Sequence, residues 1–515
     1  MRSVESVLFL VVLATVVATF ARRIQVPAPS LLVVAGVLVA LIPGTPDFTV
    51  TPELVGLVVL PPLLYAAGEE LSWRELRQVW RPVTVLAVGL VIASAAAVGA
   101  VTVWATNLPV SLAFVLGAVL ASTDPVAVSA LGRRLSLPAR LQTLVQGESL
   151  FNDATSLILF RISVGFAVGA AIGWGHVAAE FLQLAVGGAA IGAVVAGGVF
   201  LIRRRTQDPV LESVIALVTP YLAYILAELA HASGVTAVVV ASVSLGAVAH
   251  RLTSPHTRLQ LAAVYPTVIF LLESAVFSLI GLQLPALVRR LAAAGQAWVL
   301  AAVVISVTLL AVRVAWVLPI SYVAARRTRP AGPVWRVTAV IAWAGTRGVV
   351  PLAAALSIPL TNDSGAPLAG RDLVLVLAIA VIAISLVVQG FTLSGVVRRS
   401  GLALPGSHAD AEVLAARDRL DTYALSYLDD LVARDAGDAA LVDRVRQQLR
   451  DRIDGRRRGA GDEGHAEAYR RLWQDVVAVQ TQELARMYAS DELSDAAYQQ
   501  VQRQLDLEHA RLSDD

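Results

Sequence analysis

Two stretches of the sequence place acidic, amide and hydroxyl side chains inside long apolar runs. They are Ser122-Thr123-Asp124-Pro125 and Gly147-Glu148-Ser149-Leu150-Phe151-Asn152-Asp153. Ionisable side chains at bilayer depth are costly unless they are paired or hydrated, so they mark candidate functional positions. A lone carboxylate could instead be a paired packing residue, and Ser and Thr often hydrogen-bond to their own helix. Two carboxylates, an amide and several hydroxyls together favour a binding site.

The residue types and their spacing suit a small, hard cation. Pro125 cannot donate a backbone hydrogen bond, so Asp124 lies beside backbone groups that a broken helix leaves free. Breaks of this kind occur in membranes only where protein or a cavity encloses them, and they build cation sites. Ser149 and Asp153 are four residues apart and share a helix face, with Asn152 one residue round. Oxygen ligands of this kind bind hard cations rather than soft metals.

A second interruption comes late in the chain. The segment Ala344-Gly345-Thr346-Arg347-Gly348-Val349-Val350-Pro351 places two Gly, an Arg and a Pro inside another apolar run. Paired interrupted helices in the two halves of a transporter are the best sequence pointer to a midplane site. We therefore predict an inverted repeat with two crossed discontinuous helices. Arg347 would either neutralise a helix dipole end or pair with a carboxylate, and Glu148 is the expected partner.

The elements that must position these residues are membrane-spanning helices. Hydrophobic residues make up 57% of the 515 residues and charged residues only 16%, whereas a soluble domain carries about a quarter charged residues. A span needs about 20 apolar residues. We predict about thirteen spans, at 4–21, 28–43, 53–68, 82–106, 110–131, 140–172, 175–202, 209–231, 234–250, 260–288, 296–325, 334–358 and 371–397. The predicted fold is an all-α polytopic membrane protein, with a transmembrane domain over residues 1–398.

Residues 399–515 have the composition of a soluble segment. Apolar periodicity predicts tail helices at 409–431, 439–453, 466–488 and 493–512, with a charged, Gly-rich break at 456–464. Because no catalytic spacing occurs there, we expect a regulatory or dimerising helical tail rather than an enzyme domain.

Arginine residues collect in every second loop. The groups are Arg22-Arg23; Arg74, Arg77 and Arg81; Arg133, Arg134 and Arg140; Arg203 to Arg205; Arg251 and Arg258; Arg326, Arg327 and Arg329; and Arg398-Arg399. By the positive-inside rule these loops are cytoplasmic. The N-terminus is then outside the cell membrane and the tail inside, although Arg289-Arg290 lies on the other side. The apolar run at 7–20 is followed by a poor cleavage context, so we interpret it as a retained first helix.

Composition also excludes several classes of function. The net charge is only +2 and the arginines are scattered through loops, so we expect no nucleic-acid partner. The sequence contains no Cys, which excludes disulfides and thiol chemistry. None of the seven His lies in the middle of a predicted span, which argues against a transition-metal site. We expect no cofactor.

Three motifs carry a resemblance to a known family. Thr123-Asp124-Pro125, Gly147-Glu148-Ser149-x-x-Asn152-Asp153 and Gly345-Thr346-Arg347-Gly348 resemble those of the electroneutral monovalent cation/proton antiporters, the bacterial NhaP and animal NHE type. The resemblance covers about residues 1–398. It implies an NhaA-like fold with a mobile core and a dimerising scaffold that includes the first helices, and hence a homodimer.

The resemblance also implies residue roles. Asp153 carries the ion or the proton, and Ser149, Asn152 and the Thr123 carbonyl join it around Na⁺. Asp124 supports the site, and Glu148 forms a structural ion pair with Arg347.

One position departs from the family pattern. The family often has an acid a few residues after its Pro-Pro, where this sequence has Ala66. Glu69 and Glu70 follow, and they either supply a displaced accessory acid or face water. Five further ionisable residues, Arg161, Glu212, Glu228, Glu273 and Arg313, are expected to form mutual ion pairs, with Arg161 and Glu273 as one candidate pair.

The expected activity is exchange of a monovalent cation for H⁺, in the service of pH homeostasis. Asp153 binds Na⁺ (or Li⁺ or K⁺) and H⁺ in turn, and the core moves only when that charge is neutralised. With Asn152 in place of a second acid, the family analogy implies electroneutral one-for-one exchange. The alternatives are a potassium/proton antiporter and a membrane-anchored sensor that acts through its tail. A cation channel is disfavoured because no repeated filter motif appears in the sequence. A membrane enzyme is disfavoured because no nucleophile–base pair appears.

Overall fold

The computed structural model describes residues 28–42, 52–124, 139–169, 174–206, 208–252, 255–293, 298–328, 334–401, 406–433 and 439–461, together with a few single residues. In these residues the regular structure is helical, apart from an isolated bridge between Thr361 and Pro367. The chain divides into two compact units, Met1–Gly406 and Ser407–Asp515. The all-α prediction is confirmed. Its physical basis is that a backbone in lipid must satisfy its polar groups internally.

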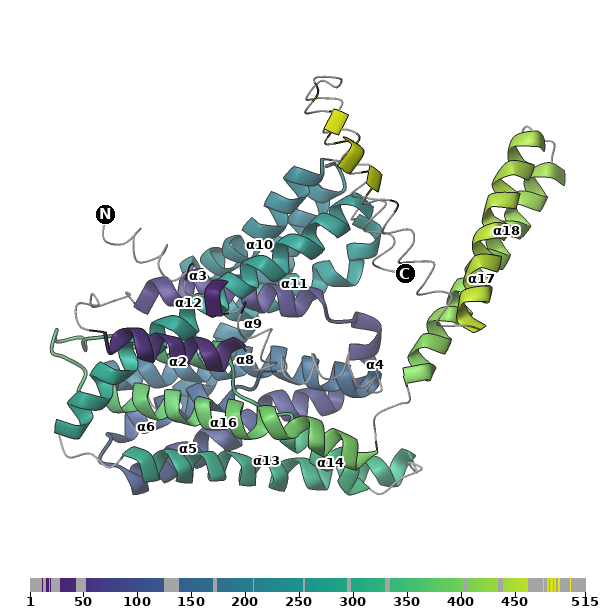
Figure 1. Ribbon diagram of the computed structural model, residues 1–515. Helices are drawn as coiled ribbons and strands as arrows, with labels where there is room; N and C mark the ends of the chain where they lie inside the picture. Colours follow the sequence, from purple (N-terminus) through teal and green to yellow (C-terminus); the bar gives the residue numbers. More distant parts are fainter. Residues whose placement is uncertain are drawn as a thin grey trace. The chain divides into compact units, whose positions relative to one another are not determined.

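The helices of the first unit are shown in Figure 1. They are α2 (Ala28–Ala40), α3 (Pro52–Glu69), α4 (Trp73–Thr84), η1 (Val85–Leu90), α5 (Val91–Ala105), α6 (Val110–Ala121), α8 (Ala139–Val168), α9 (Trp174–Arg203), α10 (Pro209–Leu229), α11 (Gly234–Leu252), α12 (Pro255–Ala293), α13 (Trp298–Thr328), α14 (Val334–Trp343), α15 (Val349–Leu356) and α16 (Arg371–Ser400). η1 is a single π-helical segment between α4 and α5.

Seven helices in the described residues are long and apolar enough to cross a membrane, and four shorter apolar helices accompany them. The predicted first span, at 4–21, lies almost wholly outside the described residues. The total of thirteen therefore remains a prediction. Two predicted spans are interrupted in the structure: the helix at 110–131 ends at Ala121, and the one at 334–358 is divided into α14 and α15.

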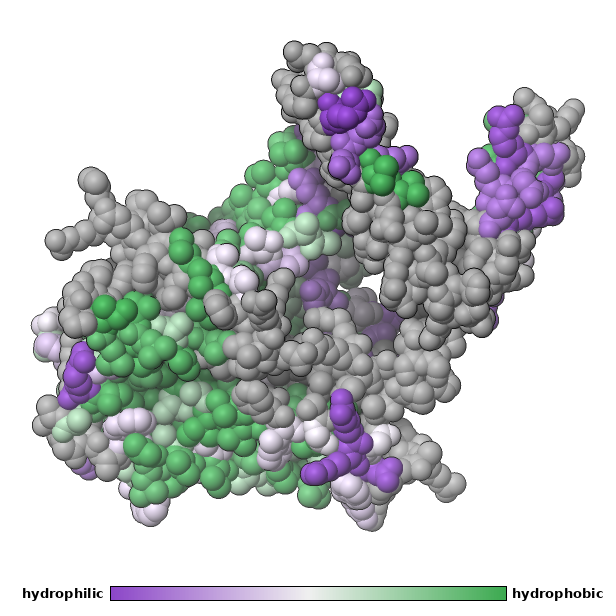
Figure 2. Space-filling model, in the orientation of Figure 1, coloured by the Kyte–Doolittle hydropathy of each residue, from purple (hydrophilic) through white to green (hydrophobic). Residues whose placement is uncertain are grey.

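The outer surface of the first unit carries apolar side chains. On α13, Val303, Val307, Val314 and Leu318 form an exposed stripe at helical spacing. Figure 2 shows apolar residues gathered over the same face of the molecule as α5 and α13. Such a surface suits lipid rather than water. It agrees with a multi-pass membrane protein.

The interior is built by close helix packing. α2 and α12 approach so closely that a Cβ atom on Gly281 would overlap the Val33 carbonyl oxygen. Small residues at helix contacts are typical of membrane bundles. α6, α15 and α16 supply the most buried segments, including residues 352–356 and 373–378. These helices surround the polar residues described below.

In the second unit, α17 (Gly406–Ala433) and α18 (Ala439–Gly461) are linked by an ion pair between Arg446 and Asp429, 2.8 Å apart. These helices correspond to the predicted ones at 409–431 and 439–453. The predicted start of the break at residue 456 is wrong, because helix α18 continues to Gly461. The other predicted tail helices lie mostly outside the described residues.

Candidate ion-binding site

Two unwound segments meet inside the first unit. α6 ends at Ala121, and Ser122 that follows is extended, with φ −68° and ψ 146°. Residues 344–348 separate α14 from α15. The Asp124 amide donates to the Thr346 carbonyl at 2.7 Å, and the Thr346 hydroxyl donates to the Asp124 carbonyl at 2.8 Å. Each interruption thus satisfies backbone groups that the other leaves free. Pro125 lies outside the described residues, and the predicted crossing of the two helices remains a prediction.

Two glycines make this meeting sterically feasible. A Cβ atom on Gly348 would overlap the carboxylate of Asp124. A Cβ atom on Gly345 would lie 2.5 Å from the Nε of Arg313. The Gly-Thr-Arg-Gly sequence is therefore required by the side chains that pass these two positions, and not only by the break in the helix.

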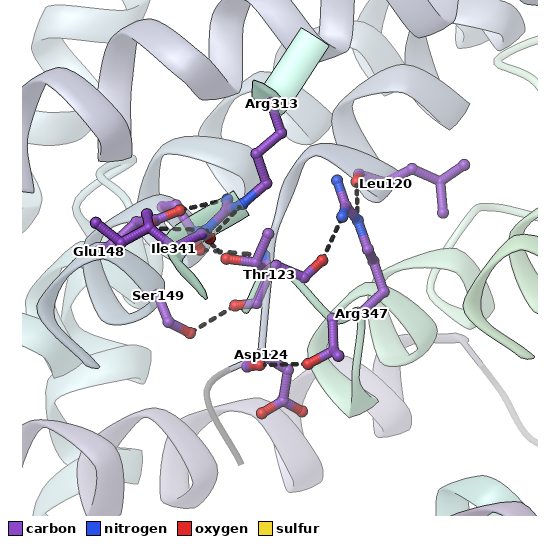
Figure 3. Close-up of polar contacts among 11 residues, drawn as sticks. Leu120, Thr123, Asp124, Glu148, Ser149, Arg313, Ile341 and Arg347 are labelled. Atoms are coloured by element: carbon purple, nitrogen blue, oxygen red, sulfur yellow. Dashed lines mark hydrogen bonds and ion pairs between the residues drawn. The ribbon is translucent and has the colours of Figure 1, made fainter. Parts of the chain in front are cut away.

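Four of the predicted binding residues lie together. The Ser149 hydroxyl donates to the Thr123 carbonyl at 2.5 Å, and the Asn152 amide donates to the Thr123 hydroxyl at 2.6 Å. The Thr123 amide donates to the Asn152 Oδ1 at 3.4 Å. All of these residues and Asp153 are buried. One turn of α8 therefore faces the extended segment that follows α6, as Figure 3 shows for Ser149 and Thr123.

Asp153 receives a hydrogen bond from the Ser122 hydroxyl. Ser122 was not among the predicted ligands, although it directly precedes Thr123. The sequence feature that could have identified Ser122 as a ligand is its position in the same interrupted segment as Thr123. The carboxylate, the Ser122 and Ser149 hydroxyls, the Thr123 carbonyl and the Asn152 amide form an oxygen-rich cluster of the kind that holds hard cations. Among the described residues, no group of three or more His, Cys, Asp or Glu side chains is placed to hold a metal ion.

The predicted ion pair between Glu148 and Arg347 is wrong. Glu148 instead forms a bidentate pair with Arg313 of α13, with distances of 2.6 and 3.0 Å. Arg313 also donates from Nε and Nη2 to the Ile341 carbonyl, each at 3.1 Å. The pair is buried and joins α8, α13 and α14 (Figure 3). Arg313 reaches Glu148 because Gly345 leaves space for its side chain.

Arg347 has the other role considered from the sequence, at a helix end. Its Nε donates to the Leu120 carbonyl at 3.2 Å, and its Nη1 donates to the Gly345 carbonyl. Leu120 belongs to the last turn of α6, whose carbonyl groups carry partial negative charge and lack helical partners. The Arg347 amide donates to the Ser385 hydroxyl at 3.1 Å. Arg347 thus closes the end of α6, as Figure 3 shows.

The remaining charges form separate contacts. Arg161 pairs with Glu228 at 2.9 Å, so the candidate pair with Glu273 is wrong. Arg161 faces α10 and the turn after it, where it also donates to the Ala232 carbonyl. Arg203 and Glu212 lie 4.0 Å apart, both buried. Of the five residues expected to pair with one another, only Arg161 and Glu228 do so. Glu212 and Arg313 lie against Arg203 and Glu148 instead, and Glu273 forms no ion pair with another described residue.

The two candidate accessory acids differ in their surroundings. Glu70 is exposed, whereas Glu69 is half-buried at the end of α3 and interacts electrostatically with Arg203. Ala66 packs against the apolar core. Glu69 thus lies beside the cationic end of α9, and an ion-binding role for either acid remains a prediction.

The fold and the site together define a class of protein. A multi-pass helical protein with a buried oxygen cluster, at the meeting of two interrupted helices, is a secondary ion transporter. Comparison with known proteins then gives the family. The family model described as sodium/hydrogen exchanger, transmembrane, matches residues 10–399. The chain belongs to the sodium/hydrogen exchanger family. The protein is therefore a transporter and not an enzyme. The ions are its transported substrates, and transport in this family requires no cofactor.

Individual relatives agree with this assignment. An uncharacterized Na⁺/H⁺ exchanger of Mycobacterium tuberculosis is 35% identical over 99% of this chain and 96% of that protein. The Na⁺/H⁺ antiporter ApNhaP of Aphanothece halophytica is 32% identical over 77% of this chain and 74% of that protein. A sodium, potassium, lithium and rubidium/H⁺ antiporter of Bacillus subtilis is 32% identical over 70% of this chain and 56% of that protein.

Among solved structures, the sodium proton antiporter MjNhaP1 from Methanocaldococcus jannaschii at pH 8 has a similar fold. The TM-score is 0.62 and the sequence identity 16%, over 78% of this chain and 100% of that one. At this identity the likeness supports the fold alone.

Proposed function

We propose that the protein exchanges Na⁺ for H⁺ by letting the two ions compete for the carboxylate of Asp153. One observation carries the proposal. Asp153 is 7% exposed and, in the described part of the chain, has no ion-pair partner. A buried carboxylate without a counter-charge is costly. A proton or a metal cation can each supply the missing charge, and we propose that the oxygens of Ser149, Thr123 and Asn152 complete the shell of a cation.

The mechanism follows from that electrostatic requirement. The charged, empty site is too costly to move through the low-dielectric interior, so the core changes access only when Asp153 carries one ion or the other. This gives an elevator-type alternating-access cycle. Because Asn152 is neutral, each cycle carries one Na⁺ against one H⁺ and no net charge.

The decisive experiment is Asp153→Asn in everted membrane vesicles, with a pH-gradient dye read on addition of NaCl. We expect complete loss of Na⁺-dependent dissipation of the gradient. Asp363→Asn, which removes an exposed carboxylate from the loop before α16, is the matched control and retains exchange. Undiminished exchange in Asp153→Asn would refute the assignment. A membrane-potential dye that remains steady on NaCl addition supports the one-for-one exchange.

A potassium/proton antiporter is the second candidate. The sodium, potassium, lithium and rubidium/H⁺ antiporter of Bacillus subtilis is 32% identical to this chain, so the family includes members with a wide cation range. Vesicle exchange with NaCl, KCl and LiCl at several pH values separates the candidates. We expect NaCl to dissipate the gradient at lower concentration than KCl.

We further propose a homodimer in the cell membrane, with the N-terminus outside and the tail as a regulatory module in the cytoplasm. The alternation of arginine-rich loops supports this orientation. The sequence has no Cys, so single cysteines report access directly. Asp363→Cys should react with an impermeant maleimide in intact cells, and Asp430→Cys only after permeabilisation. The reverse pattern excludes this orientation.

Deletion of residues 402–515 tests the role of the tail. An antiporter should keep its exchange activity without these residues, whereas a sensor that acts through the tail would lose its output.

A further inference from the structure

α4, η1, α8, α9 and α11 line an open cavity of about 510 Å³, and no residue of the oxygen cluster is part of its lining. Its walls are mostly apolar, and Leu76, Val83, Phe151, Ile158 and Phe181 are among the residues that line it. A volume of this size lies within the range of about 300–1,000 Å³ found for small-molecule sites. The cavity therefore has the size and lining to bind an apolar chain.

The polar groups of the cavity do not suit a cation. Among the described residues that line it, the charged one is Arg77. The Thr84 and Thr155 hydroxyls donate to carbonyls of their own helices at 2.9 and 3.0 Å, and the Thr236 hydroxyl contacts Ser233 at 3.0 Å. A guanidinium at the wall repels Na⁺. The charged group of the lining therefore favours an anion over a cation.

The composition of α4 and its position in the chain suit the level of the lipid headgroups. η1 and α5, of 6 and 15 residues, are together long enough to cross the hydrocarbon core of about 30 Å. α4 continues the same helix at its N-terminal end and is strongly amphipathic, with Leu76, Val79 and Val83 buried. Its place at the end of the apolar span and its composition are typical of a membrane interface.

The outer face of α4 is basic and aromatic. Arg74, Arg77 and Arg81 are exposed. Trp73 and Trp80, which line the cavity, are 51% and 53% exposed. The acid of this helix, Glu75, accepts a hydrogen bond from Thr143 of α8. At the cavity itself the positive charge is that of Arg77, and the two tryptophans flank it. Arginine and tryptophan in such a place are typical of sites for anionic headgroups at membrane interfaces.

We propose that this cavity binds one anionic glycerophospholipid. One acyl chain occupies the apolar space between α8, α9 and α11, and the phosphate contacts Arg77. Trp73 and Trp80 flank the glycerol region. The proposal goes beyond ion exchange and does not depend on it, because lipid binding is measured without transport.

The test uses the full-length protein, purified in detergent and titrated with phosphatidylglycerol or with phosphatidylcholine of the same acyl chains. Native mass spectrometry gives the dissociation constant of the first bound lipid. We expect phosphatidylglycerol to bind about fivefold more tightly, as expected for one arginine near an anionic headgroup. Arg77→Gln removes this preference. Arg74→Gln, on the same helix but outside the cavity lining, preserves it.

A second substitution tests the acyl chain independently. Ala185→Phe fills the cavity from α9 and weakens the first binding event for both lipids, whereas Ala190→Phe on the exposed face of α9 leaves it unchanged. Equal effects of Arg77→Gln and Arg74→Gln, or unaltered binding in Ala185→Phe, overturn the proposal. Displacement of the lipid by inorganic phosphate also overturns it, since the site would then hold a free anion. A folding defect in one variant, seen by size-exclusion chromatography, leaves the other variant decisive.

Discussion

α8 carries two buried carboxylates, Glu148 and Asp153, with opposite surroundings. Glu148 is 1% exposed and is held by both Nη atoms of Arg313. Asp153 is 7% exposed, receives a hydrogen bond from the Ser122 hydroxyl and has no ion-pair partner among the described residues. Burial is thus nearly the same, and the counter-charge differs. The two positions thus separate a carboxylate that arginine already neutralises from one that still lacks a positive charge, and the second is the one that we propose for a mobile ion.

The largest effect on stability is expected when Glu148 is neutralised. Glu148→Gln leaves Arg313 buried without its charge partner, at a cost of about 3–5 kcal/mol in the free energy of unfolding. Asp153→Asn removes an uncompensated charge and should leave that free energy unchanged or raise it. Unfolding in mixed detergent–denaturant micelles measures both, with Glu70→Gln as the exposed control. Equal losses of unfolding free energy in Glu148→Gln and Asp153→Asn would contradict the proposed difference between the two carboxylates.

A double substitution sharpens the same comparison. Replacing both Glu148 and Arg313 by Leu should recover much of the stability lost in Glu148→Gln, because apolar groups of similar volume often replace a buried pair without loss.

The next effect concerns the contact between the interrupted helices. Gly348→Ala forces a methyl group against the Asp124 carboxylate, and overpacking of this kind costs about 1–3 kcal/mol. We also expect a higher NaCl concentration for half-maximal exchange, since Asp124 adjoins Thr123. Gly165→Ala on α8, where a Cβ atom meets nothing within 4 Å, is the control. Normal exchange and stability in Gly348→Ala would show that the segment adapts freely.

A smaller effect is expected at Arg347. Arg347→Lys keeps the positive charge at the end of α6, but a single ammonium cannot reproduce the guanidinium contacts with the Leu120 and Gly345 carbonyls. The loss of one such hydrogen bond should cost about 1–2 kcal/mol, measured by the same unfolding experiment. Arg347→Gln should cost more. If Lys and Gln behave alike, the positive charge is irrelevant to this helix end.

The smallest effect is expected at the partly exposed pair. The side chains of Arg161 and Glu228 are 40% and 37% exposed, so their attraction is screened by solvent. Arg161→Gln should change the free energy of unfolding by less than about 1 kcal/mol, and less again at high salt. A loss as large as that of Glu148→Gln would mean that exposure does not control the strength of these pairs.

The residues whose proximity in the structure follows from the sequence are local in the chain. Ser149, Asn152 and Asp153 lie within about one helical turn, so their common location follows from helix geometry alone. The interruption before α15 is visible because Gly and Pro stand inside an apolar run. These signals need no knowledge of distant residues.

The partners of the buried charges could not be predicted in the same way. Glu148 and Arg313 are 165 residues apart, and whether Arg313 or Arg347 reaches Glu148 depends on the rotation of α13 about its axis. Ser122 was missed because successive side chains of an extended segment point to opposite sides. Which side faces α8 is settled only by the packing of the two helices.

The two hydrogen bonds between Asp124 and Thr346 also bear on how the protein is made. These residues are separated by 222 positions, so most of the membrane domain is translated after Asp124 and before its partner. Until Thr346 is inserted, the amide and carbonyl of Asp124 lack these partners in a bilayer that offers none. The early half of the nascent chain must therefore keep this segment hydrated or shielded, and its final burial waits for the arrival of the late half.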